Sequence, residues 1–146
     1  MVEYFKRPGI LDGRTYRKTC GCGKMYVTVN YDNNGLIRET FFHLGKAGQC
    51  GASQLEALGR AISTALRSGA DPILLAKQLI GIRCPSSIWD SGDQILSCAD
   101  AIGKAIKEEY ERQENLKAIE EVVERHVQNM SVQVEPDIDK VIEKEG

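Results

Sequence analysis

The sequence has no long apolar run, no excess of basic residues and no Cys-x-x-Cys pair, and each absence narrows its possible roles. A membrane-spanning helix needs about 20 consecutive apolar residues, and the polar residues 1–6 do not resemble a secretory signal. A formal net charge of −2 offers no general attraction for nucleic acid or an anionic membrane. We therefore expect a cytoplasmic protein with no nucleic-acid or membrane partner.

Aromatic residues are also scarce, at 6% with a single tryptophan. A chain of 146 residues of which 42% are apolar is nevertheless long enough to form one hydrophobic core. The charged fraction of 27% is that of a soluble globular protein. The sequence contains no recognisable Ser/His/Asp set and no recognisable catalytic pair of carboxylates, so it gives no sign of acid–base or nucleophilic catalysis. An enzymatic role is left open, and a non-catalytic one is favoured.

The N-terminal third alternates as β-strands do. Residues 25–31 place Tyr26, Thr28 and Asn30 on one face and their odd-numbered neighbours on the other. The Asn-Gly step in residues 32–35 predicts a hairpin turn, after which residues 36–44 return as a second strand. Residues 15–19 add a third strand, and the turn formers in residues 1–13 predict a lead-in arm.

From residue 55 onward the apolar spacing becomes helical. Ser53 and Glu56 form a capping box, which predicts that this helix starts just after Cys50, and Gly69 predicts its end. Asp71 predicts the N-cap of a second, short helix.

Residues 85–94 are predicted to form a loop, with Trp89 as its anchor. A second capping box, from Ser97 to Asp100, predicts that the last helix begins at Cys98.

Beyond residue 107 the chain is rich in charged residues, with a thin apolar stripe formed by Leu116, Ile119, Val123, Val127 and Met130. So narrow a stripe cannot form a core alone, and we expect a homo-oligomer through this C-terminal helix. The predicted fold is α+β: a small antiparallel three-stranded β-meander packed against helices, with a long charged C-terminal helix. Its predicted parts are the arm (1–13), the domain (14–106) and the helical extension (107–146).

Four of the five cysteines lie at turns or helix starts, where sulfur atoms can converge. Cys20 and Cys22 flank a glycine, Cys50 and Cys98 lie at predicted helix starts, and Cys84 ends a short apolar run. The positive end of a helix dipole favours thiolates at the two helix starts. Zinc binds about four thiolates, and an iron–sulfur cluster needs a similar set. The preferred ligands are Cys22, Cys50, Cys84 and Cys98, with Cys20 as a substitute for any of them.

Other interpretations stay open. Cysteines in a reduced compartment are often small buried hydrophobes. Alternatively, Cys20 with Cys22, or Cys84 with Cys98, would pass electrons as a thiol-redox pair. A third interpretation has no metal, and an anionic nucleotide is held by basic residues around the glycine turns: Arg14, Arg17, Lys18, Lys24 and Lys46.

Several ordered motifs resemble the TSCPD domain family over about residues 7–106. They include Gly21-Cys22-Gly23-Lys24, Gly45-Lys46-Ala47-Gly48, Ile82-Arg83-Cys84 and Ser97-Cys98-Ala99-Asp100. In that family the domain occurs alone, including in viruses, and at the C-terminus of adenosylcobalamin-dependent (class II) ribonucleotide reductases. The name-giving Thr-Ser-Cys-Pro-Asp begins with Leu96 here and has Ala99 in place of proline. The reductase barrel, the cobalamin site and the terminal Cys-x-x-Cys are missing, so reductase activity is not implied.

The order of strands, helices and cysteines is also similar to NifU-type iron–sulfur scaffold proteins. That resemblance implies that Cys22, Cys50 and Cys98 match the three scaffold cysteines, with Cys84 as a fourth ligand. Lys24 stands where those scaffolds carry an aspartate that helps cluster release, which favours permanent retention of a metal. Together, the resemblances imply a metal-binding accessory or interaction domain, with zinc or an iron–sulfur cluster, that binds a protein partner or a nucleotide-type ligand.

Overall fold

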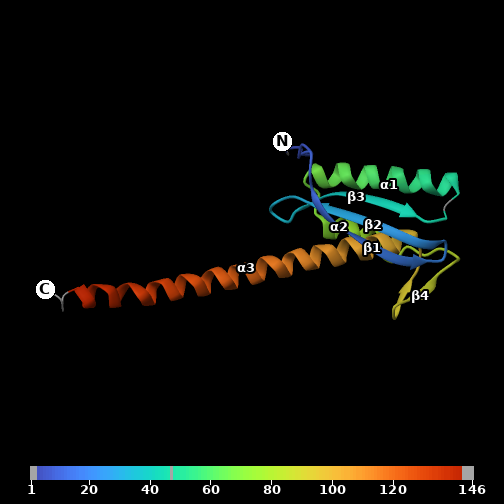
Figure 1. The fold of residues 1–146 in the computed structure, drawn as a ribbon. Helices are drawn as coiled ribbons and strands as arrows, with labels where there is room; N and C mark the ends of the chain where they lie inside the picture. Colours follow the sequence, from blue (N-terminus) through green and yellow to red (C-terminus); the bar gives the residue numbers. More distant parts are fainter. Residues whose placement is uncertain (1–2, 47, 143–146) are drawn as a thin grey trace. The chain divides into compact units, whose positions relative to one another are not determined.

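The computed structural model describes residues 3–46 and 48–142, with side chains up to residue 132 except that of Gln49. Two units, Met1–Glu111 and Arg112–Gly146, are each compact. The elements are β1 (Asp12–Cys20), β2 (Gly23–Tyr31), β3 (Ile37–Leu44), α1 (Gln49–Arg67), α2 (Pro72–Leu79), β4 (Ile88–Asp90), β5 (Asp93–Ile95) and α3 (Cys98–Ile142). The predicted α+β class is confirmed, with a three-stranded antiparallel sheet, helices and a long C-terminal helix (Figure 1).

The sheet is the predicted meander, in the order β1-β2-β3. Strands β1 and β2 pair from Asp12↔Tyr31 to Cys20↔Gly23. The β2–β3 turn is built on Asp32, whose carboxylate accepts the N–H groups of Asn34 and Leu36 at 2.9 and 3.1 Å. Gly35 closes this turn with a φ of 74°, a conformation that glycine adopts without steric cost.

One face of the sheet is the core face. Met25, Val27 and Val29 of β2, which the alternation predicted to share a face, are fully buried, and they belong to one cluster with Ile102 and Ile106 of α3. Burying a side chain of this size contributes about 1.5–3 kcal/mol to folding, so this contact is a large part of the stability. The opposite face carries the partly exposed even-numbered residues of β2.

A polar contact also joins α3 to the sheet. The Tyr16 hydroxyl of β1 donates to Glu109 at 2.5 Å. Burial, followed by the hydrogen bond and charge of Glu109, raises the pKa of Tyr16. The phenol therefore stays protonated and remains a donor, which holds α3 against β1.

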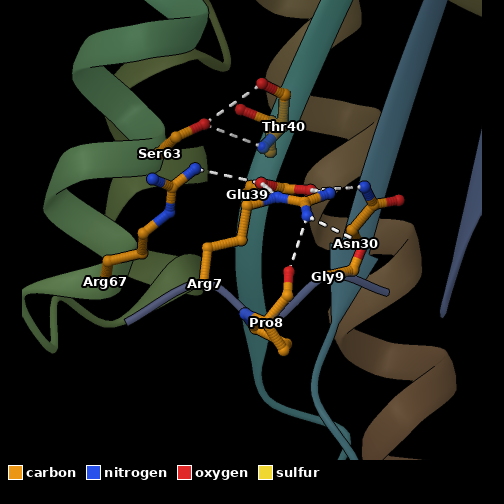
Figure 2. A network of polar contacts seen from close by, with 8 residues as sticks. All are labelled: Arg7, Pro8, Gly9, Asn30, Glu39, Thr40, Ser63 and Arg67. Atoms are coloured by element: carbon orange, nitrogen blue, oxygen red, sulfur yellow. Dashed lines mark hydrogen bonds and ion pairs between the residues drawn. The ribbon is translucent and has the colours of Figure 1, made fainter. Parts of the chain in front are cut away.

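Helix α1 runs alongside β3 (Figure 1). Gly59 allows a close approach, since a Cβ there would lie 3.3 Å from the carbonyl oxygen of Thr40. The Ser63 hydroxyl accepts the Thr40 N–H at 3.0 Å and donates to the Thr40 carbonyl at 3.2 Å (Figure 2). A helix side chain thus replaces the strand partner that this position of β3 lacks.

The start of α1 differs from the prediction. The helix begins at Gln49 after an N-cap glycine, Gly48, that makes no side-chain capping bond. The Ser53 hydroxyl donates to the Cys50 carbonyl at 2.8 Å instead of accepting a backbone N–H. The predicted capping box is therefore wrong, and Cys50 lies in the first turn of the helix and not ahead of it. The predicted end is confirmed, because Gly69 follows the helix with a φ of 92°.

The N-terminal arm is fixed by the carboxylate of Glu39, which is completely buried on β3. Arg7 binds it with two guanidinium nitrogens, each at 2.9 Å, Arg67 adds a bond at 2.9 Å, and Asn30 donates at 2.8 Å (Figure 2). Burial by itself raises the pKa of Glu39, but the hydrogen bonds and positive charges outweigh it and lower the pKa. Glu39 is therefore ionised and ties the arm to α1.

Helix α2 packs closely against the first unit's part of α3. Asp71 accepts the N–H of Ile73 at 3.0 Å, which confirms its predicted N-cap role. A Cβ at Gly103 would lie 2.8 Å from the Ala76 carbonyl oxygen, so glycine is what permits this packing.

The predicted loop at residues 85–94 contains a hairpin, β4–β5. Its turn residues Ser91 and Gly92 have φ values of 53° and 85°, and positive φ at both central residues defines a tight hairpin turn. Trp89 is 72% exposed, so the prediction that it anchors this segment is wrong. Asp90 performs that role, since its carboxylate accepts the Thr19 N–H of β1 at 2.8 Å.

The second unit is the continuation of α3 from Arg112. The predicted apolar stripe is exposed on it, with Ile119 at 59%, Val123 at 53% and Val127 at 56%. Among the described residues, no helix has both the length and the apolar character needed to cross a bilayer.

Candidate functional site

Two cysteines meet where β1 ends and α3 begins. Cys20, the last residue of β1, is 2% exposed, and its sulfur lies 3.4 Å from the sulfur of Cys98, the first residue of α3. The Cys20 thiol also contacts the Gly23 carbonyl oxygen at 3.3 Å. Cys20 is only a substitute ligand in the sequence-based prediction, but its place at the strand end brings it into direct contact with the Cys98 sulfur.

The Cys98 thiol is not the thiolate that its place at a helix start had suggested. Burial raises its pKa to about 12, and hydrogen bonding and charge interactions with Cys20 and Cys22 add to the effect. The helix dipole is therefore outweighed by burial and by the neighbouring sulfurs. The same interactions indicate that Cys22 lies beside this pair, on an exposed part of the β1–β2 turn.

The turn that carries Cys22 is pressed against the segment after Cys84. A Cβ at Gly21 would lie 1.9 Å from the Ser86 carbonyl oxygen, so only glycine fits. The Cys84 N–H donates to the Leu96 carbonyl at 3.0 Å, two residues before Cys98. Cys84, which is half-buried, is therefore held in the same region as Cys20, Cys22 and Cys98.

Asp100 fixes this region from the first turn of α3. Its fully buried carboxylate accepts N–H groups from Gly81 at 2.9 Å and Leu96 at 3.0 Å, and pairs with Lys104 at 3.0 Å. Burial raises its pKa, but these backbone bonds and the lysine outweigh burial and lower it. The Ser97 hydroxyl accepts the Asp100 N–H at 3.1 Å, which confirms the predicted N-cap. This aspartate thus positions the segments that carry Cys84 and Cys98.

Cys50 is exposed in the first turn of α1. Its helix starts at the end of the sheet that carries the Cys20–Gly23 turn, because the Gly45 N–H donates to the Lys24 carbonyl at 3.0 Å. No hydrogen bond joins Cys50 to another cysteine within the described residues. The topology therefore gathers the cysteine-bearing segments at one end of the sheet, and the thiol contacts involve Cys20, Cys22 and Cys98.

The cysteine cluster has the donor atoms of a metal site but not yet their placement. The donors are all thiols, which suit soft divalent ions such as zinc. Over residues 3–46 and 48–142, however, no group of three or more histidine, cysteine, aspartate or glutamate side chains is placed to hold a metal ion. Binding would require the exposed Cys22 and the half-buried Cys84 to adjust toward the Cys20–Cys98 pair.

The basic residues of the nucleotide interpretation are spread out. Arg14 and Arg17 lie on opposite faces of β1, because their spacing along a strand is odd. Lys18 is paired with Glu108 at 2.7 Å. Arg14, Arg17 and Lys18 therefore do not converge on one anion.

The fold and the site define a small α+β domain with a cluster of reduced cysteines at one end of its sheet. The chain belongs to the TSCPD domain family, whose pattern it matches over residues 3–110. Neither the curated proteins nor the solved structures include a significant match.

Proposed function

We propose that this chain is a non-catalytic accessory or interaction domain that holds one zinc ion with the thiolates of Cys20, Cys22, Cys84 and Cys98. The observation that supports it most directly is the 3.4 Å contact between the sulfurs of Cys20 and Cys98. A bound ion would tie the β1–β2 turn, the segment before β4 and the start of α3 together. It would therefore stabilise a surface for a partner and supply no chemistry of its own.

The sulfur separation favours a metal over a bond between the two sulfurs. With zinc–sulfur bonds of about 2.3 Å, two ligands of a tetrahedral site lie about 3.8 Å apart. A disulfide requires about 2.05 Å. The observed 3.4 Å is nearer to the zinc value, so less movement is needed to bind the ion than to form the disulfide.

Protonation makes metal uptake depend on pH. Because the pKa of the Cys98 thiol is raised to about 12, this thiol is neutral in the metal-free protein at pH 7. Only a thiolate ligates zinc, so binding must release its proton. Zinc affinity is therefore expected to rise with pH through the neutral range.

The test is metal analysis of full-length protein purified without chelators. The wild type is expected to carry about one zinc ion per chain, and Cys98→Ser to carry almost none. Cys50→Ser is the matched control, because Cys50 is a second cysteine at a helix start. A loss of zinc in Cys50→Ser would restore Cys50 to the ligand set in place of Cys20. A metal-free wild type that folds fully, and that takes up no added zinc, would refute the proposal.

A thiol-redox role is the second candidate, and the same contact favours the Cys20–Cys98 pair for it. A disulfide of a partner dithiol oxidoreductase would accept two electrons and two protons, and the Cys20 and Cys98 sulfurs would form one bond. Thiol titration separates the candidates: mild oxidation should remove two thiols reversibly in the wild type but none in Cys20→Ser. If zinc release accompanies the thiol loss, the metal site and the redox pair share these sulfurs.

The proposed partner is a protein. Membership of the TSCPD family supports an association with ribonucleotide reductase, since the domain resembles the C-terminal part of the class II enzymes. The exposed apolar residues of the second unit support self-association as well. Co-purification of the full chain with a class II reductase, and its loss in Cys98→Ser, would test the first association.

A further inference from the structure

A groove between β3 and α1 lies outside the cysteine cluster. Its volume is about 860 Å³, and no cysteine lines it. Small-molecule sites in proteins typically measure roughly 300–1,000 Å³. The groove is therefore large enough for a ligand of mononucleotide size.

The groove exists because the helix and the strand are pinned together at its floor. Gly59 and Ser63 bring α1 against Thr40, as described above, and both line the groove. Phe41 and His43, which alternate along β3 with the core-facing Thr40 and Phe42, form one side. Thr64 belongs to the opposite wall, where positions 52, 56, 60 and 64 form one face of α1.

An aromatic ring forms part of the strand-side wall. Phe41 is 54% exposed, although its neighbour Thr40 is buried. An exposed phenylalanine in a concave site offers a flat apolar surface, and aromatic rings stack on such surfaces in offset or edge-to-face geometry. The shape and apolarity of this wall suit a planar aromatic ligand.

The opposite wall and the end of the groove favour negative charge. Within the described residues, Arg60 pairs with Glu56 on the same helix, and both side chains are largely exposed, at 79% and 63%. Such a pair is weak, so Arg60 can turn to a ligand at little cost. At the end of the groove, Glu39 is already neutralised by Arg7 and Arg67. The groove and its surroundings thus hold three arginines and two glutamates, so their charges leave one positive charge in excess.

Two buried polar atoms of the lining residues lack partners within the described structure. They are Oγ1 of Thr40, on a residue that is 1% exposed, and Nε of Arg67. Buried polar groups in native proteins nearly always have a hydrogen-bond partner, and each exception requires an explanation. Both atoms are inaccessible to solvent, so a ligand in the groove would reach them only after a local movement of the chain.

We infer that the groove between β3 and α1 binds an aromatic anion of mononucleotide size, with its ring on Phe41 and its anionic group on Arg60. The site is independent of the proposed metal ion, since it shares no residue with the cysteine cluster. Metal binding and ligand binding can therefore fail separately.

The test is a backbone-amide NMR titration of the full chain with AMP, GMP, CMP and UMP, and with anthranilate as an aromatic anion that is not a nucleotide. At least one is expected to bind saturably and to shift the amides of Phe41, His43, Arg60 and Thr64. Adenosine lacks the anionic group and inorganic phosphate lacks the ring, and both should bind at least about tenfold more weakly. A preference for the nucleotides over anthranilate identifies the source of the anion.

Variants locate the site. Phe41→Ala and Arg60→Gln should each weaken binding by about tenfold, because each removes one stacking or charge-assisted contact. Thr64→Trp fills the groove from an exposed helix position and should abolish binding. Leu74→Ala and Arg83→Gln, at exposed positions outside the groove, are the matched controls and should bind as the wild type does.

Two results would overturn the inference. One is that none of the five anions binds saturably at millimolar concentration. The other is that binding occurs but survives Thr64→Trp unchanged, because a ligand in the groove cannot share its space with an indole ring.

Discussion

Replacing Glu39 with glutamine removes a negative charge from a site that is closed to water. The carboxylate accepts three hydrogen bonds from guanidinium groups and one from Asn30, and its side chain is 0% exposed. Glutamine keeps a single acceptor oxygen and turns an N–H₂ group toward the N–H donors of Arg7 or Arg67. Breaking a fully buried charge pair costs about 3–5 kcal/mol, but Arg7 and Arg67 stay partly exposed, at 40% and 21%, and water offsets part of the loss, so we expect about 2–3 kcal/mol.

For a unit of this size, that loss corresponds to a fall in Tm of about 8–12 °C. Thermal and urea unfolding of the full chain, followed by circular dichroism, would measure it. Glu56→Gln is the matched control, since Glu56 is 63% exposed in its pair with Arg60 and should change stability by less than about 0.5 kcal/mol. Equal, small losses in both variants would show that the Glu39 network does not hold the arm.

The same carboxylate makes stability depend on pH. The folded pKa of Glu39 is lowered below that of an unfolded glutamate, which is about 4.3. Its contribution is therefore fully present above that value and is lost as the pH falls through the folded pKa. The stability difference between the wild type and Glu39→Gln should shrink in acid, and a difference that stays constant from neutral pH to below pH 3 would contradict this account.

Three further perturbations test other parts of the molecule. Gly21→Ala should destabilise the domain by about 1–3 kcal/mol in urea unfolding, since the new Cβ would overlap the Ser86 carbonyl, and a stable variant would refute that close contact. Asp100→Asn should cost about 2 kcal/mol or more, because one buried N–H loses its acceptor. The lowered pKa of Asp100 also predicts that the stability of the wild type declines in acid. An Asp100→Asn variant as stable as the wild type at every pH would contradict both expectations. The double variant Ile119→Glu, Val123→Glu should lower the oligomeric state in analytical ultracentrifugation without changing the Tm of the first unit, whereas an unchanged sedimentation coefficient would argue against assembly through α3.

The sheet and the last helix could be predicted because local signals agree with tertiary structure there. The alternation of residues 25–31 matches the fully buried side chains of Met25, Val27 and Val29. The Ser97–Asp100 capping box also predicted the start of α3, because Ser97 does accept the Asp100 N–H. In both places the residue pattern and the long-range packing require the same local conformation.

Prediction failed where a local signal competed with another partner. The Ser53 hydroxyl donates to the Cys50 carbonyl, so the apparent capping box marks no helix start. The Ser91-Gly92 step contains a turn signal, but strands of three residues are too short for periodicity to reveal.

The contact between the Cys20 and Cys98 thiols depends on a distance in space that the sequence does not reveal. Cys20 and Cys98 are far apart along the chain and meet only because β1 ends where α3 begins. The glycine spacing around Cys20 and Cys22 indicated a tight turn, but it did not show which sulfur points inward. The structure shows that the Cys20 sulfur is the buried one. The groove beside Gly59 is not indicated by any local sequence pattern.

The Ser63 hydroxyl that clamps the Thr40 backbone has a consequence for solubility. An open sheet offers unpaired N–H and C=O groups along its outer strands, and these recruit strands of other molecules into aggregates. On β3 a helix occupies that position. On β1, Arg14 and Arg17 are exposed on opposite faces, and charged residues on an edge strand oppose edge-to-edge association. The two edge strands of the sheet are thus protected by different means, β3 by a covering helix and β1 by charge repulsion.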